Sequence, residues 1–160
     1  MVDKLYYRYD QLHDLCKNSS NQLINDFNPD VILAIGGGGL IPARMLRSKL
    51  KIPIYVVSLS VYDDEDNSLN EPKIVQWMDF ESIRNKRILI VDEVDDTRKT
   101  LKYLFNKLVN EEQINRENLG IFVLHNKLKV KEIDLNDLDV GYYNSGENVE
   151  DLWIVYPWDN

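Results

Sequence analysis

The sequence has one cysteine, Cys16, and two histidines. A single thiol cannot form an intramolecular disulfide, and it cannot build a cysteine-based zinc site. The two histidines also lack the spacing of a metal-binding pair. A free thiol suits a reducing compartment, so the low cysteine count favours a cytoplasmic protein.

The sequence also lacks long apolar runs and an excess of basic residues. No apolar run approaches the ~20 residues of a membrane span, and MVDKLYYRYD at the start has no apolar core of a signal peptide. The 27 acidic and 19 basic side chains give a formal net charge of −8. General binding to nucleic acid or to an anionic membrane needs a basic face, so both partners are excluded.

Glycine and proline, at 7 and 5 residues, are too few for a fibrous or low-complexity chain. The 160 residues are therefore expected to form one domain, residues 1–160, in which helices and strands alternate. Such alternation predicts an α/β fold with a mainly parallel sheet, whose ligands bind beyond the carboxyl ends of the strands. The expected helices are residues 9–27, 40–50 and 98–109, and the expected strands are residues 31–35, 52–62, 73–77, 87–94 and 119–127.

Three polar segments directly follow expected strands and should open onto one edge of the sheet. They are the glycine loop (residues 36–39), a turn-rich stretch (residues 63–72) and the acidic turn after residue 91. The turn-rich stretch is polar throughout and is expected to be a mobile loop. If this loop closes over a bound ligand, Tyr62 and Lys73 are its candidate contacts.

The acidic turn lies within ILIVDEVDDTRKTL, residues 88–101. If the strand ends near Val91 and a helix begins near Thr100, the backbone amides between them favour a phosphate. Asp92 and Glu93 would repel that phosphate unless they faced sugar hydroxyls or a Mg²⁺ ion. A sugar phosphate satisfies the whole arrangement, and a solvated charged loop is the plain alternative.

This segment resembles the phosphoribosyl pyrophosphate (PRPP) motif of the type I phosphoribosyltransferases. The resemblance implies a twisted, mainly parallel sheet flanked by helices, with a small C-terminal hood built mainly from residues 128–160. It implies that Asp92 and Glu93 hold the ribose hydroxyls and that Asp96 is catalytic, facing purine N7. It also implies a phosphate loop, residues 96–100, that binds the 5′-phosphate through Asp96, Thr97, Arg98, Lys99 and Thr100.

Arg98 departs from the family pattern, which usually has glycine at this position. If the position needs a positive φ, an arginine there is strained. If it does not, the guanidinium reinforces phosphate binding.

The glycine loop, in AIGGGGLIPARML, resembles the pyrophosphate-binding loop of the same family. Missing Cβ atoms let backbone amides converge on an anion, through a positive φ or a strained peptide. Some relatives have a basic residue here, whereas this chain has none before Arg44. The residues implied for pyrophosphate binding are Gly36, Gly37, Gly38 and Gly39.

The tail DLWIVYPWD, residues 151–159, resembles the hood of bacterial xanthine-guanine and fungal hypoxanthine/xanthine phosphoribosyltransferases. By that match Trp153 stacks on the purine and Ile154 lines the pocket, whereas the alternative is that Trp153 belongs to the core. A lysine should donate to the purine O6, with Lys127 the first candidate and Lys129 the second. Asp159 should lie on the metal and pyrophosphate side.

The implied reaction converts a 6-oxopurine (hypoxanthine, guanine or xanthine) and PRPP to IMP, GMP or XMP and pyrophosphate. Mg²⁺ is the implied cofactor, bound near Asp92, Glu93 and Asp159 mostly through water or PRPP. The resemblance also suggests a homodimer or homotetramer. Two alternatives remain, namely a phosphoribosyltransferase for another base and a non-catalytic regulator that senses PRPP or nucleotides.

Overall fold

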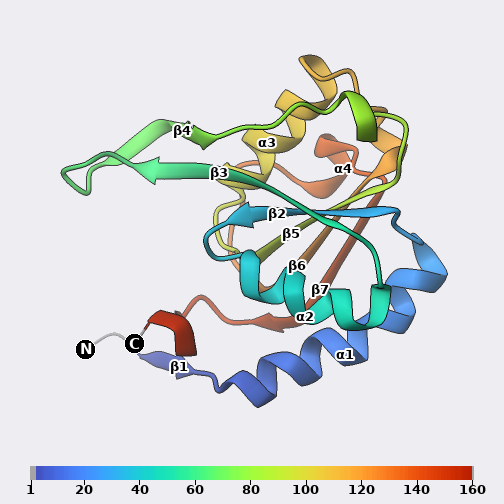
Figure 1. The fold of residues 1–160 in the computed structure, drawn as a ribbon. Coiled ribbons are helices and arrows are strands. Elements are labelled where there is room, and N and C mark those ends of the chain that lie inside the picture. Colours follow the sequence, from blue (N-terminus) through green and yellow to red (C-terminus); the bar gives the residue numbers. More distant parts are fainter. Residues whose placement is uncertain (1–2, 160) are drawn as a thin grey trace.

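The computed structural model describes residues 3–159, and a six-stranded sheet forms its centre (Figure 1). The strand order is β4-β3-β2-β5-β6-β7. Every neighbouring pair is parallel except β3 and β4, which confirms the mainly parallel α/β sheet. The strands are β2 (Val31–Gly36), β3 (Ile54–Tyr62), β4 (Ser68–Gln76), β5 (Ile88–Asp95), β6 (Leu119–Lys127) and β7 (Tyr142–Val149).

Helices cover both faces of this sheet. In Figure 1, α1 (Tyr9–Asp26) and α2 (Leu40–Leu50) lie below it, and α3 (Lys99–Asn110) and α4 (Leu135–Leu138) lie above it. Residues 3–159 also contain three short 3₁₀ helices, η1 (Glu81–Ile83), η2 (Arg116–Asn118) and η3 (Pro157–Asp159). Among residues 3–159 no helix is both long and apolar enough to cross a membrane.

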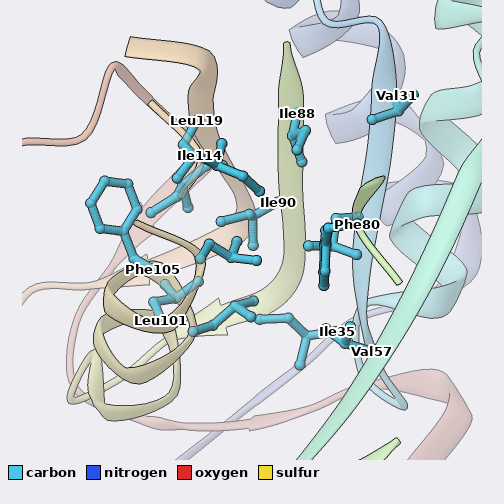
Figure 2. Close-up of a cluster of buried hydrophobic side chains, with 14 of the residues drawn as sticks. Val31, Ile35, Val57, Phe80, Ile88, Ile90, Leu101, Phe105, Ile114 and Leu119 are labelled. Carbon is cyan, nitrogen blue, oxygen red and sulfur yellow. The ribbon is translucent and has the colours of Figure 1, made fainter. Parts of the chain in front are cut away.

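The central strand β2 is apolar and buried along its whole length because both of its faces are covered. Along β2, Val31, Leu33 and Ile35 pack toward α3, whereas Ile32 and Ala34 pack toward α1 and α2. This follows from the two-residue period of a strand. Figure 2 shows the α3-side cluster, where strand residues meet apolar side chains of α3 and of the segment around η1.

Residues 63–72, expected to be a loop, mostly belong to a β-hairpin. β3 and β4 pair antiparallel, and residues 63–67 form the turn between them. Asp63 closes this turn because its Oδ1 accepts the backbone N–H groups of Glu65 and Asn67, at 2.9 and 2.8 Å. The hairpin extends past the carboxyl end of β2, which Figure 1 shows on the left.

A second, two-stranded sheet joins the two ends of the described chain. β1 (Lys4–Tyr6) pairs parallel with β8 (Trp153–Val155). The hood therefore consists of β1, β8 and η3. Residues 142–149, expected within it, instead form β7 at the edge of the main sheet, because they pair with β6 along most of its length.

Candidate active site

The phosphate loop lies in a tighter connection than expected, because β5 continues to Asp95 and α3 begins at Lys99. A cavity of about 240 Å³ lies against this connection. The hairpin residues Val61, Tyr62 and Ser68 line the cavity on one side. On the other side it is lined by Asp92, Glu93, Val94, Asp95, Asp96, Thr97, Arg98, Lys99, Thr100 and Leu101.

Asp92 and Glu93 lie near the end of β5, where their charges are poorly solvated. Asp92 is buried, and its Oδ1 accepts the Glu93 backbone N–H at 2.9 Å. Burial and then the charge of Glu93 raise the pKa of Asp92. Burial also raises the pKa of Glu93 to about 7, opposed by a hydrogen bond with Asp92 and reinforced by the charge of Asp159. Asp159 lines the same cavity as Glu93, which agrees with the effect of its charge on the pKa of Glu93.

Asp92 and Glu93, with Asp159 on the same side, concentrate negative charge that a divalent cation would offset. They do not form a protein-only metal site, because residues 3–159 contain no group of three acidic, His or Cys side chains arranged to hold an ion. A cation at this position would need oxygen ligands from water or substrate as well. Asp92, Glu93 and Asp159 are thus suited to hold a partly hydrated Mg²⁺ beside a phosphorylated ligand.

The glycine loop needs glycine for space rather than for an unusual φ, since none of the described glycines has a positive φ. A Cβ on Gly38 would lie 0.9 Å from Glu93 Oε2, and one on Gly39 would lie 2.3 Å from the Val91 carbonyl oxygen. The peptide bond between Gly36 and Gly37 is cis. Gly37 has open space around its Cα, so this part of the loop can receive a ligand.

Arg44 does not supply the basic group that the glycine loop lacks. Its side chain is exposed on α2 and donates to Ser48 Oγ at 3.2 Å. Arg44 also does not line the cavities beside the loop. Backbone amides are therefore the main groups that the glycine loop offers to an anion.

A larger cavity of about 720 Å³ connects the glycine loop, the acidic residues and the hood. Trp153 on β8 lines it and is 62% exposed, which contradicts the alternative that this residue belongs to the core. Trp158 instead stacks on Tyr156, with ring centroids 4.7 Å apart and planes 4° apart. The full lining is Gly37, Gly38, Leu40, Ile41, Tyr62, Glu93, Val94, Asp96, Lys127, Trp153, Ile154, Tyr156, Trp158 and Asp159.

Asp96 faces this cavity within a cluster of alternating charges. Its Oδ1 lies 2.9 Å from Lys129 Nζ and 3.7 Å from Lys127 Nζ, and Asp151 Oδ1 lies 3.2 and 3.9 Å from the same two nitrogens. Burial acts to raise the pKa of Asp96, but the Lys129 hydrogen bond and the charges of Lys127, Lys129 and Lys131 outweigh it. The pKa of Asp96 therefore lies below its ordinary value, and Asp96 is an ionised acceptor at neutral pH.

Lys127 and Lys129 differ in their access to the cavity. Lys127 is buried at the end of β6 and lines the cavity, whereas Lys129 is half-buried, pairs with Asp96 and does not line it. Both lysines lie beside Asp96 and Asp151. If Lys127 turned toward a ligand, Lys129 would therefore still pair with Asp96. This geometry favours Lys127 as the donor to a bound base.

Arg98 adopts the left-handed conformation, with φ 69° and ψ 12°. The first of the two alternatives for this position therefore holds, since the φ is positive, and the buried side chain pairs with Asp95. Arg98 can offer a phosphate only its backbone N–H. Lys99 is also engaged, because its Nζ donates to the Leu69 carbonyl oxygen of the hairpin at 3.2 Å.

A buried link between β6 and the hood was not predicted from the sequence. His125 Nδ1 and the Tyr156 hydroxyl lie 2.7 Å apart, and that hydroxyl donates to the Glu93 carbonyl oxygen at 3.1 Å. Burial lowers the pKa of His125 to about 4, so the imidazole is neutral at pH 7. His125 therefore positions the hood rather than binding ligand, and only its place within an apolar strand could have indicated this.

One sheet edge thus carries an anion-binding loop, a second loop with bare backbone, carboxylates for hydroxyls or a cation, and an aromatic platform. These features define an α/β enzyme that handles a nucleotide-like ligand. The sequence model of the phosphoribosyl transferase domain family matches residues 8–152. The chain belongs to this family of phosphoribosyltransferases, which are glycosyltransferases of the pentosyl class.

Among curated proteins, the chain is 43% identical to the hypoxanthine-guanine phosphoribosyltransferase of Schizosaccharomyces pombe, covering 98% of this chain and 89% of that one. It is 40% identical to xanthine phosphoribosyltransferase 1 of Saccharomyces cerevisiae, covering 98% and 90%. Among solved structures, a Neisseria gonorrhoeae protein with bound ppGpp has a TM-score of 0.85 and 42% identity, covering 100% and 91%.

Proposed function

We propose that this protein transfers the phosphoribosyl group of PRPP to N9 of a 6-oxopurine, giving a nucleoside 5′-monophosphate and pyrophosphate. The observation that carries the proposal is the placement of Asp96 and Lys127 at one cavity with Trp153. A 6-oxopurine has an N7 proton for a carboxylate acceptor, an O6 for an ammonium donor, and a face for an indole. Adenine presents an amino group instead of O6, so Lys127 would meet a donor.

PRPP would lie along the carboxyl edge of the sheet. Backbone amides at the start of α3, with the hydroxyls of Thr97 and Thr100, would hold the 5′-phosphate. Asp92 and Glu93 would accept hydrogen bonds from the ribose hydroxyls. The open backbone around Gly37 would receive the pyrophosphate group.

Mg²⁺ is the proposed cofactor, held near Glu93, Asp159 and Asp92 with PRPP and water completing its ligands. Bound there, the ion would neutralise charge on the pyrophosphate leaving group. Its positive charge would also oppose the burial and the repulsion from Asp159 that raise the pKa of Glu93.

The side chains divide the remaining work. Asp92 and Glu93 would hold the ribose while positive charge develops at its C1′, and Asp96 would accept the N7 proton as the base attacks. Lys127 would orient the base through O6, and Trp153 would cover its face. The hairpin, which Lys99 ties to the phosphate loop, would exclude water from the reacting sugar.

An ultraviolet assay with PRPP and Mg²⁺ tests this function against hypoxanthine, guanine, xanthine and adenine. The 6-oxopurines should turn over and adenine should not. Asp96→Asn should lower kcat by roughly 10²–10⁴-fold, the usual contribution of a general base. Asp151→Asn is the matched control and should lower kcat by less than about tenfold. Asp151 also pairs with Lys127 and Lys129, but it does not line the cavity. Absence of turnover with every base, while PRPP still binds, would reject the proposal.

A second candidate activity is the binding of ppGpp, which the Neisseria gonorrhoeae relative carries in its crystal structure. This would make the chain a nucleotide sensor, with or without catalysis. Titration calorimetry with ppGpp, alone and in the presence of PRPP, would test it, and competition would indicate a shared site.

We also propose a cytoplasmic location and a homodimer or homotetramer. Light scattering would test the oligomeric state.

A further inference from the structure

We propose that Arg98 and Asp95 are positioning residues, whose buried ion pair sets the backbone of the phosphate loop for PRPP. This inference rests on the proposed function for its kinetic part. Neither side chain would touch a substrate, and Arg98 has a backbone conformation that glycine adopts more readily.

The backbone of Arg98 is held in a conformation that a side chain disfavours. A φ of 69° brings Cβ close to the following carbonyl oxygen, so this region is ordinarily left to glycine and asparagine. Arg98 lies between Thr97 and Lys99, in the turn that precedes the first helical turn. A change in its φ would reorient the peptide groups on both sides, and these belong to residues that line the 240 Å³ cavity.

The side chain of Arg98 supplies the interactions that fix this conformation. Its Nε and Nη2 both donate to Asp95 Oδ2, at 3.0 and 2.6 Å, and its Nη1 donates to the Ile133 carbonyl oxygen at 3.1 Å. Asp95 is fully buried and the guanidinium nearly so. A planar fork on a buried carboxylate leaves few alternative orientations, so the pair restricts the loop more than a surface pair would.

Neighbouring groups hold Asp95 and the loop from the other side. The Tyr143 hydroxyl of β7 donates to Asp95 Oδ2 at 2.7 Å. Lys131 Nζ donates to the carbonyl oxygens of Asp95 and Asp96, at 2.6 and 2.7 Å, and the Glu132 N–H donates to the Thr97 carbonyl oxygen at 2.9 Å. The contacts of Lys131, Glu132 and Ile133 join the phosphate loop to the segment that follows β6.

Because the pair acts on the loop amides and not on the reacting atoms, its loss should appear in PRPP affinity. Arg98→Lys keeps the charge but removes the fork, and Arg98→Gly keeps the φ accessible but removes the tether. Both should raise the Kd and KM for PRPP by about tenfold or more, with kcat at saturating PRPP and the KM for the base within about threefold. Tyr143→Phe removes one hydrogen bond from the rim of the pair and should raise the Kd by a few-fold.

Lys51→Gly is the matched control. Lys51 also has a left-handed backbone, with φ 55°, but it is exposed at the end of α2. This substitution relieves the same backbone conformation without removing a tether, so PRPP binding and turnover should be unchanged. A lower melting temperature for Arg98→Gly is expected as well, because the buried Asp95 would lose its closest cation and keep only the Tyr143 hydroxyl and Lys131 Nζ at 3.7 Å.

The measurements are calorimetric titration with PRPP and Mg²⁺, steady-state kinetics and thermal unfolding. Normal PRPP affinity in folded Arg98→Lys and Tyr143→Phe variants would overturn the inference and leave the pair a purely structural element. Calorimetry tests the pair even if the wild-type protein turns over no base. That outcome would reject the proposed function and not the positioning role.

Discussion

Glu93 retains its proton at a pH where an ordinary glutamate has lost it. The unfolded chain should release this proton near pH 4.5, whereas the folded chain releases it near pH 7. Between these values the folded state binds more protons than the unfolded state, so the free energy of unfolding falls as pH rises. Without ligand, this term should destabilise the protein by up to about 3 kcal/mol at pH 8 relative to pH 4.5.

Glu93→Gln should remove this pH dependence, since the amide does not ionise. Denaturant unfolding of both proteins between pH 4.5 and 8 would measure it, with the exposed Glu117→Gln as a control that keeps the wild-type slope. Parallel pH profiles for wild type and Glu93→Gln would contradict the raised pKa.

Lys127 and Lys129 can be separated by matched substitutions to methionine. Lys127→Met should lower kcat/KM for 6-oxopurines by about 10²-fold, because it removes a charged hydrogen bond worth about 1.5–3 kcal/mol. Lys129→Met removes only the closest partner of Asp96 and should cost less than about tenfold. Steady-state kinetics with hypoxanthine would decide, and a larger loss for Lys129→Met would assign O6 recognition to Lys129.

For individual residues, the sequence indicated which side chains gather at the sheet edge, but not how they pair. Asp96, Lys127 and Trp153 were predicted at the site and line one cavity. Asp95 was part of the acidic turn without a role. Its pairing depends on the φ of Arg98 and on Tyr143, which follows it by 48 residues, and such pairings arise only from tertiary structure.

The hood presents its two nearby tryptophans in different ways. Trp153→Ala should raise the KM for the purine by about tenfold or more, because base stacking on an aromatic ring is worth about 1–3 kcal/mol. It should leave the unfolding free energy nearly unchanged, since the indole is 62% exposed. Trp158→Ala should instead lower that free energy by about 2 kcal/mol through loss of its stacking on Tyr156. Kinetics and denaturant unfolding of both variants would check this, and the reverse pattern would return Trp153 to a core role.

Elements with strong periodicity or continuous apolar runs were predicted well, as α1, β2 and α3 illustrate. The prediction of a loop at residues 63–72 was wrong, because charged residues fill the turn of the hairpin and hide the alternation of β4. β1 was missed because three residues carry no detectable period, and its conformation depends on β8 at the other end of the chain. The extension of β5 through Asp95 depends on pairing with β6, which local sequence does not reveal.

The molecule as a whole derives its stability from two apolar layers on opposite faces of one sheet. Leu104→Ala, in the α3-side layer, should lower the free energy of unfolding by about 2–5 kcal/mol, because it leaves a cavity in a fully buried site. Ile24→Ala on the exposed face of α1 is the control and should change it by less than about 0.5 kcal/mol. Denaturant unfolding measures both, and a small effect of Leu104→Ala would mean that the layer repacks.

The pairing of β1 with β8 has a consequence for biosynthesis. The ribosome releases Lys4 well before Trp153, its partner in the hood. The sheet and its phosphate loop precede the hood in the chain, so they can fold while β1 still waits for its partner. The nascent protein would therefore acquire its phosphate loop first, and the hood would form only after β8 has left the exit tunnel.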